Sequence, residues 1–188
     1  NDILKVDLNE IIKQAKEKFN LKNAKIVANL PYYITTPIIM KLLESKIDIT
    51  SITVMIQKEV ADRLAEIPGG KNTGAITYTV YYYGEPEKLL EVPKSSFIPE
   101  PSVTSEVIKI NIRKEPPVKV QNEERFFKLI KVAFLQRRKT LLNSLTNNGI
   151  SNKEELTQLL SKLNIDEKIR SEKLTIDQFA ELSNNLNT

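Results

Sequence analysis

Asn29-Leu30-Pro31-Tyr32 follows directly on a short apolar run, Ile26-Val27-Ala28. Such a run predicts a buried strand of a parallel sheet. A Pro cannot continue the strand, because its nitrogen carries no hydrogen for the sheet ladder. The chain is therefore predicted to turn at the carboxyl end of this strand, which is where open α/β sheets bind their ligands.

The predicted turn brings together a side-chain amide, backbone carbonyls and an aromatic ring. The amide oxygen of Asn29 and a neighbouring carbonyl can accept both N–H bonds of an exocyclic amine. The Tyr32 ring can stack on the flat ring that carries this amine. These groups suit adenine. The four residues alone, however, favour an ordinary strand-to-loop turn with a buried Tyr, so the interpretation depends on the rest of the sequence.

Three further blocks change that balance. They are Val54–Leu64 with Gln57-Lys58-Glu59-Val60, the stretch Phe-Ile-Pro-Glu-Pro-Ser-Val-Thr-Ser at 97–105, and Phe-Leu-Gln-Arg-Arg-Lys-Thr-Leu at 134–141. Together with the block 29–36, this series resembles the KsgA-type ribosomal RNA adenine dimethyltransferase family, and the resemblance covers nearly the whole chain. Antibiotic-resistance rRNA methyltransferases share the architecture. Leu30, the 57–60 block and the Arg-Arg-Lys-Thr block are more similar to the housekeeping dimethyltransferase.

The resemblance implies an α/β fold class with two domains. Residues 1–113 would form part of a Rossmann-like S-adenosylmethionine-dependent methyltransferase domain, 114–121 a linker, and 122–188 a small all-helical RNA-binding domain. Pro116-Pro117 also indicates a linker, since two Pro interrupt helices and strands. No Gly-x-Gly motif stands among the five Gly. We therefore expect the first strands and the Gly-rich cofactor turn of such a domain to be missing from this chain.

Apolar periodicity and capping residues predict the individual elements. The predicted strands cover 25–29, 51–57, 88–92 and 107–112. The predicted helices cover 8–19, 37–45 with Thr36 as its cap, 58–66, and much of 122–188, ending with a helix at 175–186. Residues 75–83 are rich in Thr, Val and Tyr, which favours a strand. The family has a helix there, and we expect a helix because tertiary context often overrides propensity.

The resemblance also implies catalytic roles. The residues concerned are Asn29, Leu30, Pro31, Tyr32 and Phe97, with the target base lying against Tyr32 and covered by Phe97. The lone pair of an adenine N6 amine is delocalised into the ring. Accepting both of its hydrogens on Asn29 and the Leu30 carbonyl would orient the amine and make it more nucleophilic, so no general base is needed beforehand.

The sequence also predicts contacts with the cofactor and with RNA. By resemblance, Asp2 and Asn29 are expected to contact S-adenosylmethionine, with a helix-entry or turn Asp near the chain end as a strong alternative for Asp2. The chain carries a net charge of +4, and a local group of basic residues falls in the region 128–139: Lys128, Lys131, Arg137, Arg138 and Lys139. Such a cluster is typical of nucleic-acid binding, with a merely solvated face as the alternative. The RNA-contact candidates are Arg63, Arg137, Arg138, Lys139 and Arg170.

The sequence thus predicts dimethylation of the N6 amines of two adjacent adenines in the 3′-terminal hairpin of small-subunit rRNA. The expected partners are this rRNA and the pre-30S particle, and the expected protein is a cytoplasmic monomer without metal or membrane contact. The absence of His and Cys removes His-based triads and Cys-ligated metals. Two alternatives stay open: a large-subunit rRNA methyltransferase that confers antibiotic resistance, and a non-catalytic RNA-binding or ribosome-assembly factor.

Overall fold

A computed structural model describes residues 2–136 and 138–186 of the chain. The chain divides into two compact units. The first comprises Asn1–Ala65 and Thr79–Glu115, and the second comprises Glu66–Tyr78 and Pro116–Thr188. The second unit thus includes a segment that precedes the predicted linker. The methyltransferase and RNA-binding roles assigned to the two regions from the sequence remain predictions.

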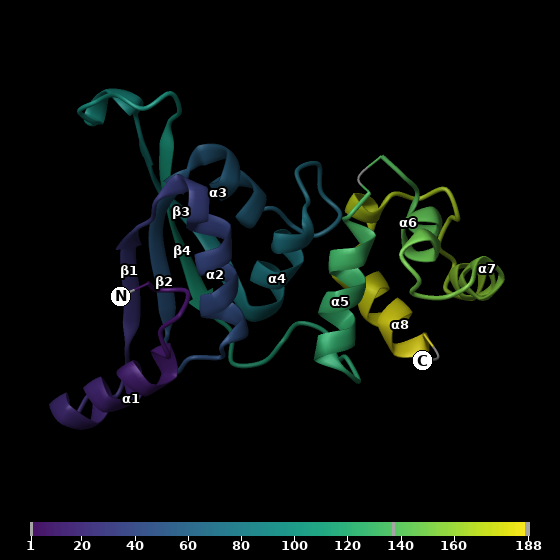
Figure 1. Ribbon diagram of the computed structural model, residues 1–188, viewed down its shortest axis with the longest axis horizontal. Helices are drawn as coiled ribbons and strands as arrows, with labels where there is room; N and C mark the ends of the chain where they lie inside the picture. Colours follow the sequence, from purple (N-terminus) through teal and green to yellow (C-terminus); the bar gives the residue numbers. More distant parts are fainter. Residues whose placement is uncertain (1, 137, 187–188) are drawn as a thin grey trace. The chain divides into compact units, whose positions relative to one another are not determined.

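Within the described residues, the first unit is built on a mixed four-stranded sheet (Figure 1). Its strands are β1 (Lys25–Asn29), β2 (Ser51–Gln57), β3 (Gly84–Val92) and β4 (Ser105–Ile112). Their order is β1-β2-β4-β3, with β1 parallel to β2 and with β4 antiparallel to both of its neighbours. The predicted α/β fold class is confirmed, and the carboxyl ends of β1 and β2 lie at one edge of the sheet.

One face of the sheet forms the core of the first unit. Ile52 and Val54 of β2 are buried and lie opposite the buried Ile110 and Ile108 of β4. Burying each such side chain stabilises the fold by about 1.5–3 kcal/mol. α2 (Thr35–Glu44) and α3 (Lys58–Leu64) cover this face (Figure 1). The helices contribute Ile38, Ile39, Leu42, Leu43, Ala61 and Leu64 to the core.

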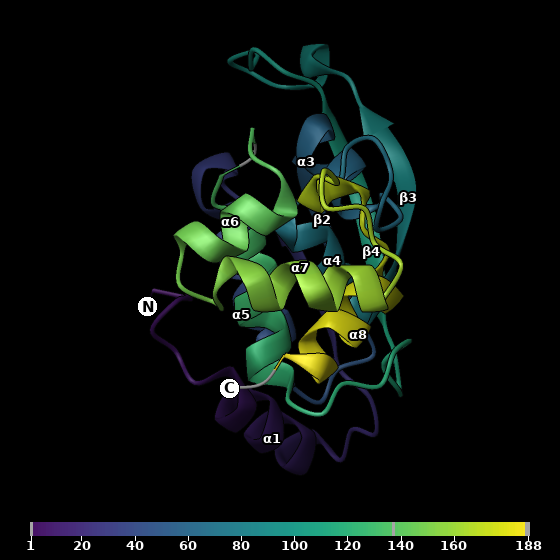
Figure 2. The same ribbon diagram turned by 90° about the vertical axis from the view of Figure 1, so that its right-hand side faces the viewer.

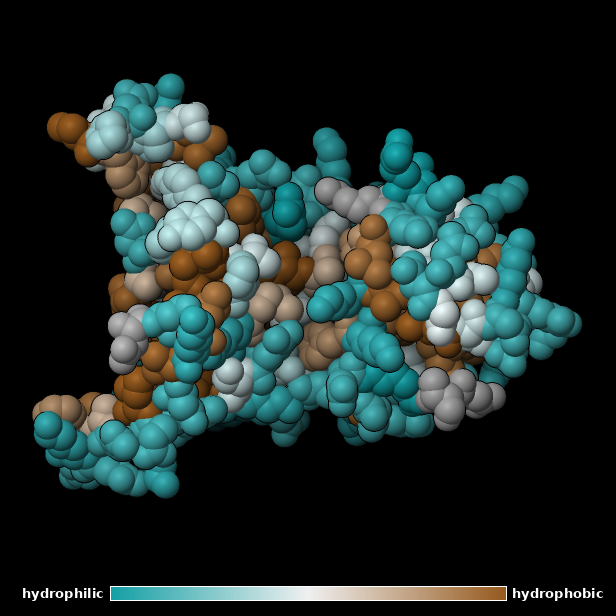
Figure 3. Space-filling view, viewed as in Figure 1, coloured by the Kyte–Doolittle hydropathy of each residue, from teal (hydrophilic) through white to brown (hydrophobic). Residues whose placement is uncertain are grey.

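The burial of β1 differs from the prediction. The strand lies where it was predicted and is parallel to β2, but Val27 is 78% exposed. Among the described strands β1 pairs only with β2, so it is an edge strand, and alternate side chains point away from the core. The prediction of a buried strand is therefore wrong. Figure 3 shows apolar surface over the region of β1 and α2.

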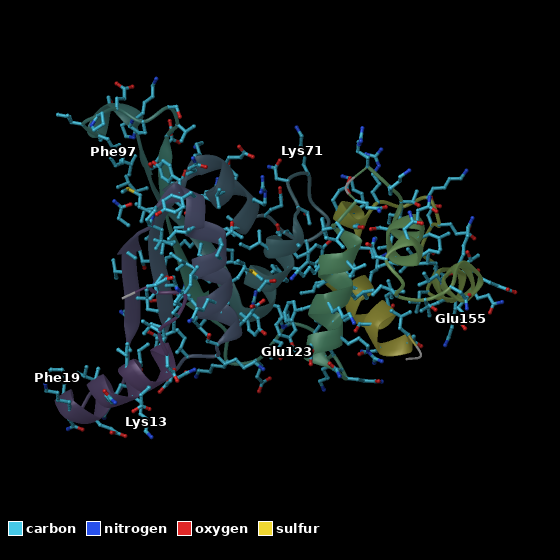
Figure 4. The ribbon with its side chains drawn as sticks, viewed as in Figure 1. Lys13, Phe19, Lys71, Phe97, Glu123 and Glu155 are labelled. Carbon is cyan, nitrogen blue, oxygen red and sulfur yellow. The ribbon has the colours of Figure 1, made fainter. Side chains whose placement is uncertain are left out.

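α1 (Leu8–Phe19) confirms the predicted helix. It begins at Asp7, whose side chain accepts hydrogen bonds from the backbone N–H groups of Asn9 and Glu10. The helix buries none of its residues, and Phe19 is 62% exposed at its end (Figure 4). Within residues 2–136 and 138–186, no helix is long and apolar enough to cross a bilayer.

α2 begins earlier than its sequence predicts. A short 3₁₀ turn, Tyr32–Ile34, leads into the helix, so Ile34 occupies the N-cap and Thr36 lies inside the first turn. The prediction of Thr36 as the cap is therefore wrong. Pro37 is the third helical residue rather than the first. A Pro is tolerated there because the N–H groups of a first helical turn have no partners within the helix.

The conflict at 75–83 is decided in favour of the helix. α4 spans Ala75–Tyr83 despite its Thr, Val and Tyr content. Ile76, Tyr78, Val80 and Tyr82 are all buried, so packing outweighs the strand propensity of these residues. Thr77 supports the start of the helix, because its hydroxyl accepts a hydrogen bond from the Gly74 N–H at 3.0 Å.

The second unit is helical from α5 onward (Figure 2). It contains α5 (Glu123–Ala133), α6 (Leu141–Asn147), α7 (Lys153–Lys162) and α8 (Ile176–Asn185). Each begins after a capping side chain, and Thr175 forms a reciprocal capping box with Gln178 at the start of α8. In α7, Leu156 and Leu160 are buried, whereas Leu159 and the C-cap residue Leu163 are half-buried.

Tyr78 anchors the core of the second unit. Its ring is fully buried and packs against Phe179 with a centroid distance of 4.9 Å. Its hydroxyl lies 2.6 Å from the Leu174 carbonyl, to which it donates a hydrogen bond, and 3.2 Å from the Ser171 carbonyl. Burial raises the pKa of the Tyr78 phenol well above its ordinary value, so the group stays protonated and keeps this hydrogen bond.

Candidate functional site

A cavity of about 330 Å³ opens at the carboxyl end of β1. Its wall comes from two segments that are far apart in the sequence, the turn after β1 and the connection between β3 and β4. The volume lies within the range of small-molecule sites, about 300–1,000 Å³. The cavity is lined by Asn29, Leu30, Pro31, Tyr32, Phe97, Pro99 and Pro101.

The backbone of the turn is held from both sides. The Leu30 N–H donates to the Met55 carbonyl of β2 at 3.3 Å, which extends the pairing of β1 by one residue. The Pro31 carbonyl accepts hydrogen bonds from the Ile34 N–H at 3.2 Å and from the hydroxyl of the buried Thr35 at 3.0 Å. These bonds fix the direction in which the turn presents its groups to the cavity.

Two acceptors of the turn remain available to a ligand. Asn29 is exposed, and its side-chain amide makes no hydrogen bond with any residue that the structure describes. The Leu30 carbonyl likewise accepts no hydrogen bond from the described parts of the chain. The cavity therefore offers an amide oxygen and a carbonyl oxygen beside an aromatic wall.

Phe97 enters from the β3–β4 connection, which projects from the end of the sheet (Figure 4). A 3₁₀ turn at Lys94–Ser96 precedes it, and the Phe97 N–H donates to the Lys94 carbonyl at 3.2 Å. Lys94 precedes Phe97 in the sequence and Glu100 follows it, and the side chains of these two residues form an ion pair of 3.3 Å. The Phe97 ring is half-buried and lines the cavity.

Lys58 holds the base of this connection. Glu91 of β3 and Glu106 of β4 lie directly opposite each other, and the Lys58 ammonium forms ion pairs with both carboxylates, at 3.5 Å from Glu106. The Glu91 carboxylate, as a hydrogen-bond acceptor, raises the pKa of Lys58. The backbone N–H of Lys58 also donates a hydrogen bond to the Thr104 carbonyl at 3.0 Å. The strands on both sides of the projecting connection are thus fastened to the start of α3.

The Tyr32 ring is fixed by a residue of β4. Its hydroxyl lies 2.6 Å from the hydroxyl of Ser105, which is fully buried. Together with Phe97 this gives the cavity aromatic side chains in a defined orientation, next to the two free acceptors. Such a wall can receive a flat ring that carries an amine.

A family comparison agrees with this geometry. The model of the ribosomal RNA adenine dimethylase family matches residues 1–188. The chain belongs to this family.

Relatives within the dimethylase family carry a common name. The ribosomal RNA small subunit methyltransferase A of Clostridioides difficile (strain 630) is 52% identical over 187 residues, which cover 100% of this chain and 64% of the relative. The protein of the same name from Alkaliphilus oremlandii (strain OhILAs) is 51% identical over 186 residues, covering 98% of this chain and 64% of that protein. The chain thus spans 64% of the length of these curated relatives.

Solved structures share the fold of this chain. A dimethyladenosine transferase from Plasmodium falciparum aligns with a TM-score of 0.68 and 24% identity, covering 93% of this chain and 76% of that one. The 23S rRNA methyltransferase ErmE aligns with a TM-score of 0.63 and 20% identity, covering 98% of this chain and 80% of that one. At these identities the likeness concerns the fold alone, and it supports the predicted Rossmann-like fold.

The residues predicted for catalysis lie together. Asn29, Leu30, Pro31, Tyr32 and Phe97 all line the cavity, and their individual roles remain predictions. The sequence did not single out Ser105, nor Pro99 and Pro101 as lining residues. The available signal was their place in the block 97–105, which returns the chain from Phe97 to β4.

Asp2 does not line the cavity. It lies in a local turn, where Oδ1 accepts a hydrogen bond from the Leu4 N–H at 3.0 Å and Oδ2 lies 3.8 Å from the Lys5 ammonium. Its contact with a cofactor remains a prediction. Within residues 2–136 and 138–186, no cluster of acidic side chains is placed to hold a metal ion.

The predicted RNA contacts fall in both units. Arg63 lies in α3 of the first unit, where its guanidinium pairs with Glu59 at 3.0 Å. In the second unit Arg138, Lys139 and Arg170 are exposed. Arg137 lies outside the described residues. Exposure makes Arg138, Lys139 and Arg170 accessible to phosphates, and the role of all five residues in RNA binding remains a prediction.

Proposed function

We propose that the full-length protein dimethylates the N6 amines of two adjacent adenines in the 3′-terminal hairpin of small-subunit rRNA. The observation that carries the proposal is the pair of free acceptors, the Asn29 amide and the Leu30 carbonyl, beside Tyr32 and Phe97 in one cavity. The names of the relatives support the small subunit rather than the large one as the source of the RNA. The enzyme would act as a monomer on a pre-30S particle in the cytoplasm.

The residues of the turn would act on the amine directly. The Asn29 oxygen and the Leu30 carbonyl would accept its two hydrogens, which holds the nitrogen toward a tetrahedral form and aims its lone pair. Stacking on Tyr32 and Phe97 would contribute about 1–3 kcal/mol for each ring, which offsets much of the cost of flipping the base out of the helix. The proton would leave to water after methyl transfer.

The proposed methyl donor is S-adenosylmethionine, which supplies an electrophilic methyl group on a sulfonium sulfur. The exposed amide of Asn29 fits a contact with the donor as well as with the base, because it offers an oxygen acceptor and an NH₂ donor at once. Asp2 fits less directly, because the local turn already occupies its carboxylate. We propose these two residues as the cofactor contacts of this chain.

The second methylation sets a requirement on the cavity. After the first transfer the amine keeps a single N–H, so one of the two acceptors loses its partner. The remaining hydrogen bond and the stacking must then hold the base. The open mouth of the cavity leaves room for the methyl group already added, which is consistent with two transfers to one amine.

A methyl-transfer assay tests this proposal. The full-length protein is incubated with S-adenosylmethionine and a small-subunit RNA hairpin that carries two adjacent adenines, and nucleosides are identified by mass spectrometry. We expect N6,N6-dimethyladenosine at both positions and none in a hairpin with guanines in their place. Methylation of large-subunit RNA alone would favour the antibiotic-resistance enzyme. RNA binding without any transfer would favour the assembly factor.

Arg138 and Lys139 provide a separate test of RNA binding. Both are exposed, and the backbone around them is supported by the Lys139 N–H, which donates to the Gln136 carbonyl at 2.9 Å. If each side chain contacts one phosphate, the double variant Arg138→Ala/Lys139→Ala should bind the hairpin more weakly. The slope of log affinity against log salt should fall by about 0.7–0.9 for each lost contact. Filter-binding titrations at several salt concentrations measure this slope.

The matched control is Lys153→Ala, which removes an exposed cation from the start of α7 in the same unit. It should leave the slope unchanged. An unchanged slope in the double variant, together with a lower melting temperature, would show that Arg138 and Lys139 stabilise the unit and do not bind RNA.

A further inference from the structure

We propose that Ser105 is a positioning residue, whose hydroxyl sets the orientation of the Tyr32 ring for stacking on the target adenine. This inference rests on the proposed function. Its observation is the 2.6 Å hydrogen bond between the two hydroxyls, which joins residues 73 positions apart in the sequence.

Ser105 is a rigid support. It is fully buried at the start of β4, the strand that lies between β2 and β3. Gln57 of β2 and Val92 of β3 flank it on the two sides of the sheet. The Thr104 carbonyl just before it is held by the Lys58 N–H. A side chain as short as Ser, fixed to a backbone paired on both sides, has little freedom to move.

Tyr32 has few constraints of its own. It begins a three-residue 3₁₀ turn after an edge strand, and its backbone neighbour Tyr33 is 85% exposed. Tyr33 makes no hydrogen bond through its hydroxyl within the described residues. Tyr32 is half-buried and bonded to Ser105, whereas Tyr33 points to solvent, so among the described residues the Ser105 hydroxyl is the hydrogen-bond partner that holds the end of the Tyr32 ring.

The strand order explains what the bond does to the ring. β2 lies between β1, which precedes Tyr32, and β4, which carries Ser105. Neighbouring strands are about 4.8 Å apart, so β1 and β4 are separated by about 10 Å. The Tyr32 side chain therefore extends across the carboxyl end of β2 to reach Ser105. The bond thus holds the end of the ring, while Tyr32 lines the cavity together with Phe97.

The consequence is that a hydroxyl outside the cavity controls how the base is stacked. Ser105 is not among the residues that line the cavity, so it would not touch the adenine. Losing its hydrogen bond would free the Tyr32 ring to rotate and would leave the amine poorly aimed. Stacking and aim matter most in the transition state, so the loss should appear in kcat.

A double-mutant cycle in the full-length protein tests the inference. Ser105→Ala and Tyr32→Phe each remove the bond and keep the ring. A hydrogen bond of this kind contributes about a three- to tenfold change in an equilibrium or a rate, so each variant should lose that factor in kcat. KM for the RNA hairpin should stay within about twofold, since phosphate contacts dominate RNA affinity. The double variant should lose no more than either single variant.

Ser102→Ala is the matched control, because Ser102 is exposed in the same connection three residues earlier. It should retain full kcat. Wild-type kcat in Ser105→Ala, or multiplied losses in the double variant, would overturn the inference while leaving the proposed function intact. If the wild-type protein forms no dimethyladenosine, the proposed function itself fails. Should Ser105→Ala unfold at the assay temperature, Tyr32→Phe decides, because it leaves β4 untouched.

Discussion

Asn29→Ala in the full-length protein should lower kcat for methyl transfer by about 100- to 1,000-fold, the usual effect of removing one preorganised hydrogen-bond partner of a transition state. The amide of Asn29 is exposed at the cavity and makes no hydrogen bond within the described residues, so its loss disturbs no structural contact. Its partner would be the amine as it becomes tetrahedral. Single-turnover kinetics with a small-subunit RNA hairpin measure the change.

RNA binding should respond differently. Affinity for RNA comes mainly from phosphate contacts, so Asn29→Ala should change the dissociation constant of the hairpin by less than about twofold. Asn23→Ala, in the exposed segment before β1, serves as the control and should leave both quantities unchanged. Equal losses of affinity and rate in Asn29→Ala would mean that this residue shapes the turn and does not act on the amine.

The largest effect on stability is expected at Phe179. Its side chain is fully buried in α8 and packs edge-on against Tyr78, with an interplanar angle of 81°. Phe179→Ala should leave a cavity there and lower the free energy of unfolding of the second unit by about 3–5 kcal/mol. Hydrogen exchange at the amides of α5 and α8 measures the stability of that unit directly.

The same substitution at an exposed site provides the comparison. Phe19 is 62% exposed at the end of α1, so Phe19→Ala should change the free energy of unfolding by no more than about 0.5 kcal/mol. A loss below about 1 kcal/mol for Phe179→Ala would mean that the helices of the second unit repack around the missing ring.

Local patterns predicted most elements of the fold. Strands β1 and β2 and helix α1 occupy their predicted ranges, because their apolar periodicity and caps act within a few residues. β3 is longer than predicted. It begins at Gly84 and contains Pro86, which a sequence pattern treats as a strand breaker. β3 pairs only with β4 among the described strands, and a Pro is tolerated on such an edge because its missing N–H faces no partner strand.

The sequence predicted most of the residues that line the cavity, but not the contacts that hold these residues in place. Asn29, Tyr32 and Phe97 stand in recognisable blocks, and the cavity contains all three. The Tyr32–Ser105 hydrogen bond and the bridging of Glu91 and Glu106 by Lys58 depend on strand order and register. No local pattern reports which strands become neighbours, because that order results from packing of the whole sheet. The predicted burial of β1 was wrong for the same reason, because an apolar run does not show whether its strand lies at the edge of the sheet.

Under the proposed function, the bonding of the turn would also determine which bases it refuses. At position 30 the N–H is already bound to Met55, and at position 31 the Pro has no N–H. A base that carries an oxygen where adenine carries its amine would set that oxygen against the Leu30 carbonyl, with no hydrogen between them. At the position of the amine, guanine and hypoxanthine have nearly the outline of adenine, so shape at that position alone would admit them. The lost hydration of two facing oxygens would exclude them.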